Sequence, residues 1–128
     1  MRFIKFGALM VFVLFLGACA STPIVVEDDL SPEELVQRAQ EASERSKYDQ
    51  AIQYYDAVLT RFPGDLSMVC AAEYEIAFIQ YKQKRYEPSK EGFRTLLKRY
   101  ASTDAALLPP QYRILAEKVL AKMELEKK

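Results

Sequence analysis

The chain has 128 residues, half of them apolar, which is enough for one domain with a hydrophobic core. Basic and acidic residues balance at 18 each, and the basic clusters set among aromatic residues that favour nucleic-acid binding are missing. Histidine is absent and there are two cysteines. Because this composition lacks the commonest general base and makes nearly every zinc site impossible, we expect no catalysis, no metal and no cofactor.

The first 18 residues are predicted to be a signal peptide and not part of the fold. Arg2 and Lys5 precede an uncharged apolar run over 6–16. A basic region followed by a short apolar core is typical of secretory signals. The run is too short to cross a bilayer, because a spanning helix needs about 20 apolar residues.

The end of this run, Leu16-Gly17-Ala18-Cys19, resembles the lipobox of bacterial lipoproteins, in which a branched residue and two small ones precede a cysteine. The resemblance implies that Cys19 is lipidated and begins the mature chain, with several acyl chains giving stable anchoring. Ala20 follows instead of Asp, which resembles Gram-negative lipoproteins bound to the outer membrane and implies a periplasm-facing anchor. The alternative is an ordinary signal peptide with a chance cysteine.

Residues 19–30 are predicted to be a lipidated tether. The segment has small residues, one proline and no helical period. It also contains the acidic cluster Glu27-Asp28-Asp29, for which plain solvation is favoured over a metal or partner role.

Residues 31–128 are predicted to form one all-α domain of five helices. Ser31 and Glu34 can form a capping box with Pro32 in the first turn, so the first helix starts there and runs to about residue 47. The second helix begins at residue 48 and closes at 62–65, where Asp65 or Ser67 is the candidate cap of the next helix.

The third helix, over 66–84, is apolar on more than one side, which is typical of a centrally buried element. A fourth helix starts at Glu87-Pro88 and runs to about residue 100. Pro109-Pro110 fixes the start of a fifth over 111–128, whose inward residues are expected to be Ile114, Leu115, Val119, Leu120 and Met123.

An internal repeat organises these helices. The stretch YDQAIQYYDAVLTRFP, from Tyr48, returns 38 residues later as YEPSKEGFRTLLKRYA, from Tyr86. Each unit can bury its apolar stripe only against a neighbour, so the chain is predicted to be a short helical solenoid. Relative to a 34-residue unit, the four extra residues are expected in the loop over 62–67.

The pattern of small and aromatic residues resembles tetratricopeptide repeats, whose unit is two antiparallel helices. Ala51, Tyr55 and Pro63 match the alanine, the aromatic residue and the closing proline of that signature. Further matches are Leu35, Ala39, Ile76, Ala77, Phe93, Tyr112, Leu115, Ala116 and Val119. The resemblance implies about two and a half repeats over 31–128.

A lipobox followed by such repeats also resembles BamD-type lipoproteins, the tetratricopeptide component of outer-membrane β-barrel assembly. The resemblance implies a scaffold or adaptor that binds envelope proteins, with β-barrel assembly subunits as partners. Alternatives are an adaptor for cell-wall or transporter complexes with the same anchor and fold, and an accessory subunit that holds an enzyme's substrate.

In such repeats the first helix of each unit lines a concave face, where a peptide-binding groove is predicted. Tyr74, Phe78 and Tyr81 are spaced four and three apart, so their rings follow one line along the third helix. The other predicted groove residues are Val36, Gln40, Ser43, Arg113 and Glu117. The alternative is that the three rings pack between helices as core.

Cys70 is expected to be a buried structural cysteine, since Cys19 would be acylated. Glu73 and Glu75 are two residues apart and are expected on different sides of the helix, so they form no acid–base pair. Two basic groups, Lys82-Lys84-Arg85 and Lys98-Arg99, are expected to solvate the loop ends, with a lipid or partner contact as the alternative.

Overall fold

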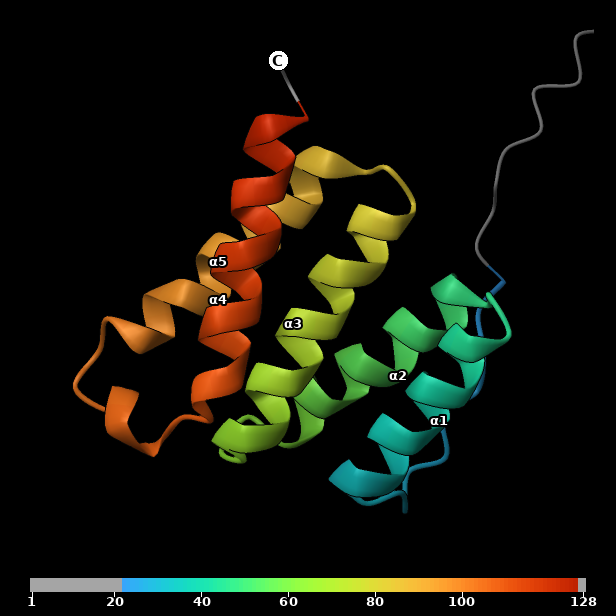
Figure 1. Ribbon diagram of the computed structural model, residues 1–128. Helices are drawn as coiled ribbons and strands as arrows, with labels where there is room; N and C mark the ends of the chain where they lie inside the picture. The colour runs from blue at the N-terminus through green and yellow to red at the C-terminus, as the bar shows by residue number, and fades with distance from the viewer. Residues whose placement is uncertain (1–21, 127–128) are drawn as a thin grey trace, which may run out of the picture.

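The computed structural model describes residues 22–126, so the predicted signal peptide over 1–18 and the predicted lipidation site Cys19 lie outside the described residues. In this range all regular structure is helical (Figure 1). The elements are α1 (Pro32–Glu44), α2 (Tyr48–Arg61), α3 (Leu66–Lys82), α4 (Tyr86–Tyr100), the short 3₁₀ helix η1 (Ala105–Leu107) and α5 (Pro110–Leu125). The all-α prediction with five main helices is therefore confirmed.

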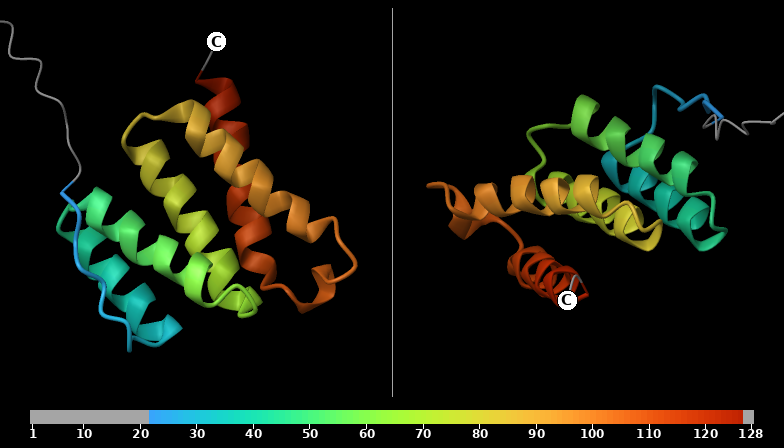
Figure 2. Two further views of the ribbon diagram at one scale, coloured as in Figure 1. Left: turned by 180° about the vertical axis from the view of Figure 1, so that it is seen from behind. Right: turned by 90° about the horizontal axis from the view of Figure 1, so that it is seen from above.

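The helices form two hairpins and a final single helix. Helices α1 and α2 pack on one another, as do α3 and α4, and α5 lies against the second pair (Figure 2). Helix α3 contacts each of the other four α-helices, which confirms it as the central element. This stack of helix pairs is the short solenoid that the repeat predicts.

Two apolar clusters form the core, and α3 contributes to both. The first fills the space between α1, α2 and α3, with Leu35, Tyr55, Val58 and Ile79 all almost fully buried. The second lies between α3, α4 and α5; its members include Cys70, Tyr74, Phe93, Leu96, Ala116 and Met123. An α3 that is apolar on several sides is what this double role requires.

The starts of α1 and α3 follow the predicted side-chain caps. The Ser31 hydroxyl accepts a hydrogen bond from the Glu34 amide at 3.2 Å, and the Glu34 carboxylate accepts one from the Ser31 amide at 2.8 Å. Asp65 caps α3 by accepting from the Met68 amide at 3.1 Å, so it fills the role left open between Asp65 and Ser67. Each cap satisfies amide groups that a helix start leaves without partners.

Helices α1 and α3 end in the same way, on a non-glycine residue in the left-handed region. Ser46 has φ 59° and Lys84 has φ 60°, and these positions are equivalent in the two repeats. The amides of Ser46 and Lys47 donate to the carbonyls of Ser43 and Ala42, both at 2.9 Å. In the second repeat the amides of Lys84 and Arg85 donate in the same way to the carbonyls of Tyr81 and Gln80. Both turns are therefore Schellman motifs, which usually have glycine where Ser46 and Lys84 stand.

The prediction about the four extra residues is wrong. The loop between α2 and α3 contains only residues 62–65, whereas α3 has 17 residues against 13 in α1. The extra residues are therefore one additional turn of α3. This additional turn contributes Met68 to the first apolar cluster and Leu66 to the second.

The inward face of α5 also differs from the prediction. Ala116 and Met123 are buried and Val119 and Leu120 pack against the second cluster, but Ile114 and Leu115 are exposed. Helix α5 packs mainly against α4 and α3, so one stripe of it is covered. The almost fully buried Lys90 strengthens this junction, since its ammonium lies 3.8 Å from a carboxylate oxygen of Glu124.

Candidate functional site

A row of aromatic rings crosses the molecule from α5 along α3 to α4. Tyr112 and Tyr74 have ring centroids 5.7 Å apart, Tyr74 and Phe78 5.8 Å, and Phe78 and Tyr81 6.0 Å. Tyr86 extends the row, 6.0 Å from Tyr81. These separations are those of favourable aromatic pairs, so the row holds three helices together as well as offering ring faces.

The row is buried at one end and accessible at the other. Tyr74 is only 7% exposed and also contacts Phe93, so for this residue the alternative of core packing holds. Phe78 and Tyr81 are half-buried and Tyr86 is 38% exposed. A ligand could therefore reach the rings of the last three residues but not that of Tyr74.

Two lysines lie over the accessible rings. The Lys82 ammonium is 4.8 Å from the Tyr48 centroid and 5.3 Å from that of Phe78, and it donates to the Ser43 hydroxyl at 3.4 Å. Lys122 lies 5.7 Å from the Tyr81 centroid. Such cation–π contacts stabilise by about 0.5–1 kcal/mol where they are exposed. Lys82 in this way links α1, α2 and α3.

Beside the rings, a polar cleft of ≈ 400 Å³ opens between α1, α2 and α3. It is lined by Gln40, Ser43, Glu44, Tyr55 and Glu75. Burial raises the pKa of the Glu75 carboxyl, and the positive charge of Lys82 partly offsets this. Burial and then the charge of Glu75 raise the pKa of the Tyr55 hydroxyl, so it stays protonated and can donate.

The structure brings together four of the predicted groove residues. Gln40 and Ser43 line the cleft, and the Lys82 side chain connects Ser43 to Phe78, which stacks on Tyr81. These side chains could contact an extended or helical segment through ring faces and polar groups together. Whether they bind a peptide stays a prediction.

The other predicted groove residues lie elsewhere. Val36 packs against the first core cluster. Arg113 lines a separate depression beside Tyr100 and Leu108, at the junction of α4, η1 and α5. Glu117 is exposed and follows Arg113 by about one helical turn. The prediction that Arg113 and Glu117 join Gln40 in one groove is therefore not met, because α5 turns its Ala116 stripe to the core.

Sequence reasoning missed Lys82, Glu75 and Tyr55 as parts of this face. The spacing from Phe78 to Lys82 is four residues, which places a cation over a ring on a helix and could have indicated the contact. Tyr55 comes from α2, and only the packing of α2 behind α1 and α3 brings its hydroxyl to the cleft.

The remaining reactive side chains serve packing. The Glu73 carboxylate accepts two hydrogen bonds from Arg99, at 2.8 and 2.7 Å, which joins α3 to α4. Glu73 and Glu75 therefore point to different sides, as predicted. Cys70 is a fully buried free thiol whose pKa burial raises, so the predicted burial of this cysteine is confirmed. Within residues 22–126 no cluster of acidic, histidine or cysteine side chains could hold a metal.

Comparison with known families finds a match to the tetratricopeptide repeat at residues 36–65 and 71–103. The chain contains tetratricopeptide repeats. The two matched stretches fall on the hairpins α1–α2 and α3–α4, so each hairpin is one repeat. As a tetratricopeptide-repeat protein it has the architecture of a protein-interaction scaffold, and no enzyme family is indicated.

Over 102 residues the chain is 41% identical to a protein of Treponema pallidum (strain Nichols) described as an uncharacterized protein. The similarity covers 78% of this chain and 41% of that relative, so the chain spans less than half of the relative's length. No solved structure matches the chain. Among the described helices, none is long and apolar enough to cross a membrane.

Proposed function

We propose that this protein is a lipid-anchored adaptor of the bacterial envelope that binds segments of other proteins on the concave side of its repeats. In this proposal Cys19 carries the lipid, and the outer membrane is the site of attachment. The binding surface consists of the rings of Phe78 and Tyr81 and the polar cleft at Gln40 and Ser43. The clients are proteins of outer-membrane assembly.

The observation that carries the proposal is the accessible aromatic row beside a polar cleft. The half-buried rings supply apolar area, while Gln40 and Ser43 supply hydrogen-bonding groups that can set the register of a bound segment. The lipobox-like end of the predicted signal peptide supports the anchor. Confinement to a membrane surface raises the local concentration, so weak contacts with a membrane-bound client suffice.

The test is purification of the tagged full-length protein from native membranes in mild detergent, with mass spectrometry of the proteins recovered. The Phe78→Ala/Tyr81→Ala variant is compared with the wild type; Tyr74 is left unchanged because its ring is core. Tyr54→Ala, on α2 and outside the row, is the matched aromatic control. A Cys19→Ser variant tests the anchor, since it should leave the membrane fraction.

The expected result is recovery of β-barrel assembly subunits with the wild type and with Tyr54→Ala, and their loss with the double variant. Recovery of cell-wall enzymes or transporter components would move the function to those complexes. Unchanged recovery with the double variant would refute the groove. Circular dichroism must show that the double variant keeps its helicity, because unfolding would mean that Phe78 and Tyr81 are also core.

A further inference from the structure

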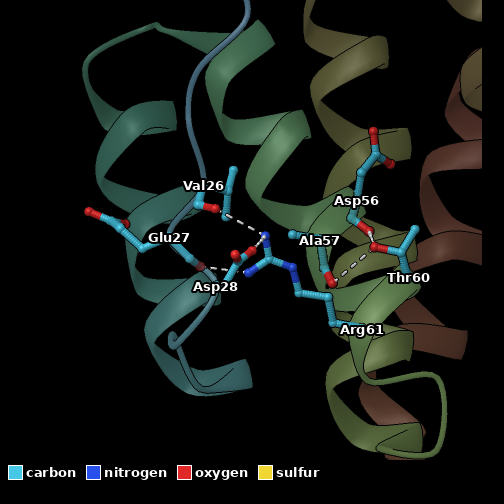
Figure 3. Close-up of polar contacts among 7 residues, drawn as sticks. All are labelled: Val26, Glu27, Asp28, Asp56, Ala57, Thr60 and Arg61. Atoms are coloured by element: carbon cyan, nitrogen blue, oxygen red, sulfur yellow. Dashed lines mark hydrogen bonds and ion pairs between the residues drawn. The ribbon is translucent and has the colours of Figure 1, made fainter.

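Residues 22–30 do not hang free but lie along the first repeat (Figure 3). The guanidinium of Arg61, at the end of α2, donates to the backbone carbonyls of Val26 at 3.1 Å and Glu27 at 2.6 Å. It also forms an ion pair with Asp28 at 3.5 Å, but the Asp28 side chain is fully exposed. The two carbonyl bonds therefore carry the interaction, because exposed ion pairs contribute little.

A second contact lies two helical turns earlier on α2, at Gln53. Its side-chain oxygen accepts from the Ile24 amide at 3.0 Å, and its side-chain nitrogen donates to the Thr22 carbonyl at 3.2 Å. One amide group thus pairs with a donor and an acceptor of the same extended backbone, much as a neighbouring β-strand would. Gln53 binds only the backbone of the segment, and Arg61 binds mainly its backbone, since its one side-chain contact is the exposed ion pair with Asp28.

Apolar contacts also hold the segment on the first repeat. Val26 and Leu30 are partly buried and pack against the first core cluster. The segment therefore combines backbone hydrogen bonds with apolar burial, and both must break for it to leave the surface.

The second repeat shows why Arg61 is available for this contact. Arg61 and Arg99 are equivalent positions, 38 residues apart. Arg99 is held by Glu73, but the position equivalent to Glu73 in the first repeat is Leu35. With an apolar side chain in that place, the Arg61 guanidinium turns to residues 26–28. Gln53 is likewise replaced in the second repeat, by the exposed Glu91.

We propose that Gln53 and Arg61 form a backbone clamp that docks residues 22–28 on the first repeat and thereby fixes the domain close to its membrane anchor. The proposal rests on the proposed lipidation of Cys19. Three residues from Cys19 to Thr22 span at most about 10 Å, whereas a free segment from Cys19 to Ser31 would reach about 40 Å. Docking therefore limits the height of the domain above the membrane and the directions in which its cleft can face.

The clamp is tested first by amide hydrogen exchange on the full-length protein in detergent micelles. In the wild type, exchange of the Ile24 amide is expected to be at least roughly tenfold slower than in Gln53→Ala/Arg61→Ala, because this amide donates to Gln53 and the docked segment must open before it exchanges. Thr60→Ala is the neighbouring control, since its hydroxyl bonds only to the Asp56 and Ala57 carbonyls of its own helix (Figure 3). Arg94→Ala, on exposed α4 surface, matches the charge change.

The second measurement gives the height of the domain over vesicles that carry quencher-labelled lipids. A fluorophore at residue 40, introduced as Gln40→Cys in a Cys70→Ser background, reports the distance from the cleft to the surface. The clamp variant is expected to show a broader distance distribution that extends farther from the vesicle than in the wild type, Thr60→Ala and Arg94→Ala. Cys70→Ser alone must first be shown to keep its helicity.

Equal exchange of the Ile24 amide in the wild type and the clamp variant, with both folded, would overturn the clamp and leave the proposed adaptor intact. Slow exchange in a protein that does not bind membranes would refute the anchor and, with it, the positioning role of the clamp. Slow exchange with identical distance distributions would also overturn the positioning role.

Discussion

The two left-handed residues that end α1 and α3 offer a direct test of the repeat geometry. A residue with a Cβ in the left-handed region lowers the free energy of unfolding by about 1–2 kcal/mol, because its Cβ approaches a carbonyl oxygen. Glycine avoids this loss of stability. Its unfolded backbone is freer, however, and this lowers the free energy of unfolding by about 0.5–1 kcal/mol. We therefore expect Ser46→Gly and Lys84→Gly each to stabilise the fold by about 0.5–1 kcal/mol, since their φ angles are 59° and 60°.

The two sites lie in different repeats, so their effects should add to about 1–2 kcal/mol, or a rise in Tm of roughly 5–15 °C for a domain of this size. Thermal unfolding of the full-length protein, followed by circular dichroism, measures this. Ser46→Ala keeps a Cβ and should give no gain, and Gln37→Gly on the exposed face of α1 should lose about 1 kcal/mol. If either glycine variant were less stable than the wild type, the left-handed backbone at Ser46 or Lys84 would not cost the fold stability.

Two further substitutions test the packing and the electrostatics of the domain. Gly92→Ala should destabilise the domain by about 1–2 kcal/mol, measured by urea denaturation. A Cβ on Gly92 would lie 2.9 Å from the Cβ of buried Ala77, and this overpacking outweighs the gain in helix propensity. A variant more stable than the wild type would show that α3 and α4 have room to separate. For Glu75→Gln we expect higher stability at pH 7 and little difference near pH 4. Burial raises the pKa of Glu75 above its usual 4.5, so its stabilising contribution is present below pH 4.5 and is lost as the pH rises through the folded pKa. Urea midpoints of both proteins between pH 4 and 7 measure this, and a difference that does not change with pH would contradict the reasoning.

The helices and their order could be predicted because the deciding interactions are local. The capping box at Ser31 and the apolar spacing from Tyr48 act within a few residues of sequence. The repeat then indicated which helices stack. Its length did not reveal where the extra residues lie, because a longer loop and an additional helical turn give the same 38-residue spacing.

The candidate site was predictable only in part, because it depends on how each helix is rotated about its axis. Phe78 and Tyr81 could be placed on one face from spacing alone. Arg113 could not, because α5 has neighbours on only one side and packs its Ala116 stripe inward. The clamp at Arg61 depends on a carboxylate being missing from α1. This could be recognised only once the structure showed that Arg99 pairs with Glu73, the residue equivalent to Leu35.

That difference between the repeats also bears on how the chain reaches its native state. Similar units can pair out of order during folding, which is a known hazard of repeat proteins. A hairpin that placed Glu73 beside α2 in the position of Leu35 would put a carboxylate into the first apolar cluster. The reverse exchange would leave Arg99 facing leucine, without its two charge-assisted hydrogen bonds. The difference at this one pair of positions would therefore disfavour an exchange of partners between the two similar hairpins while the protein folds.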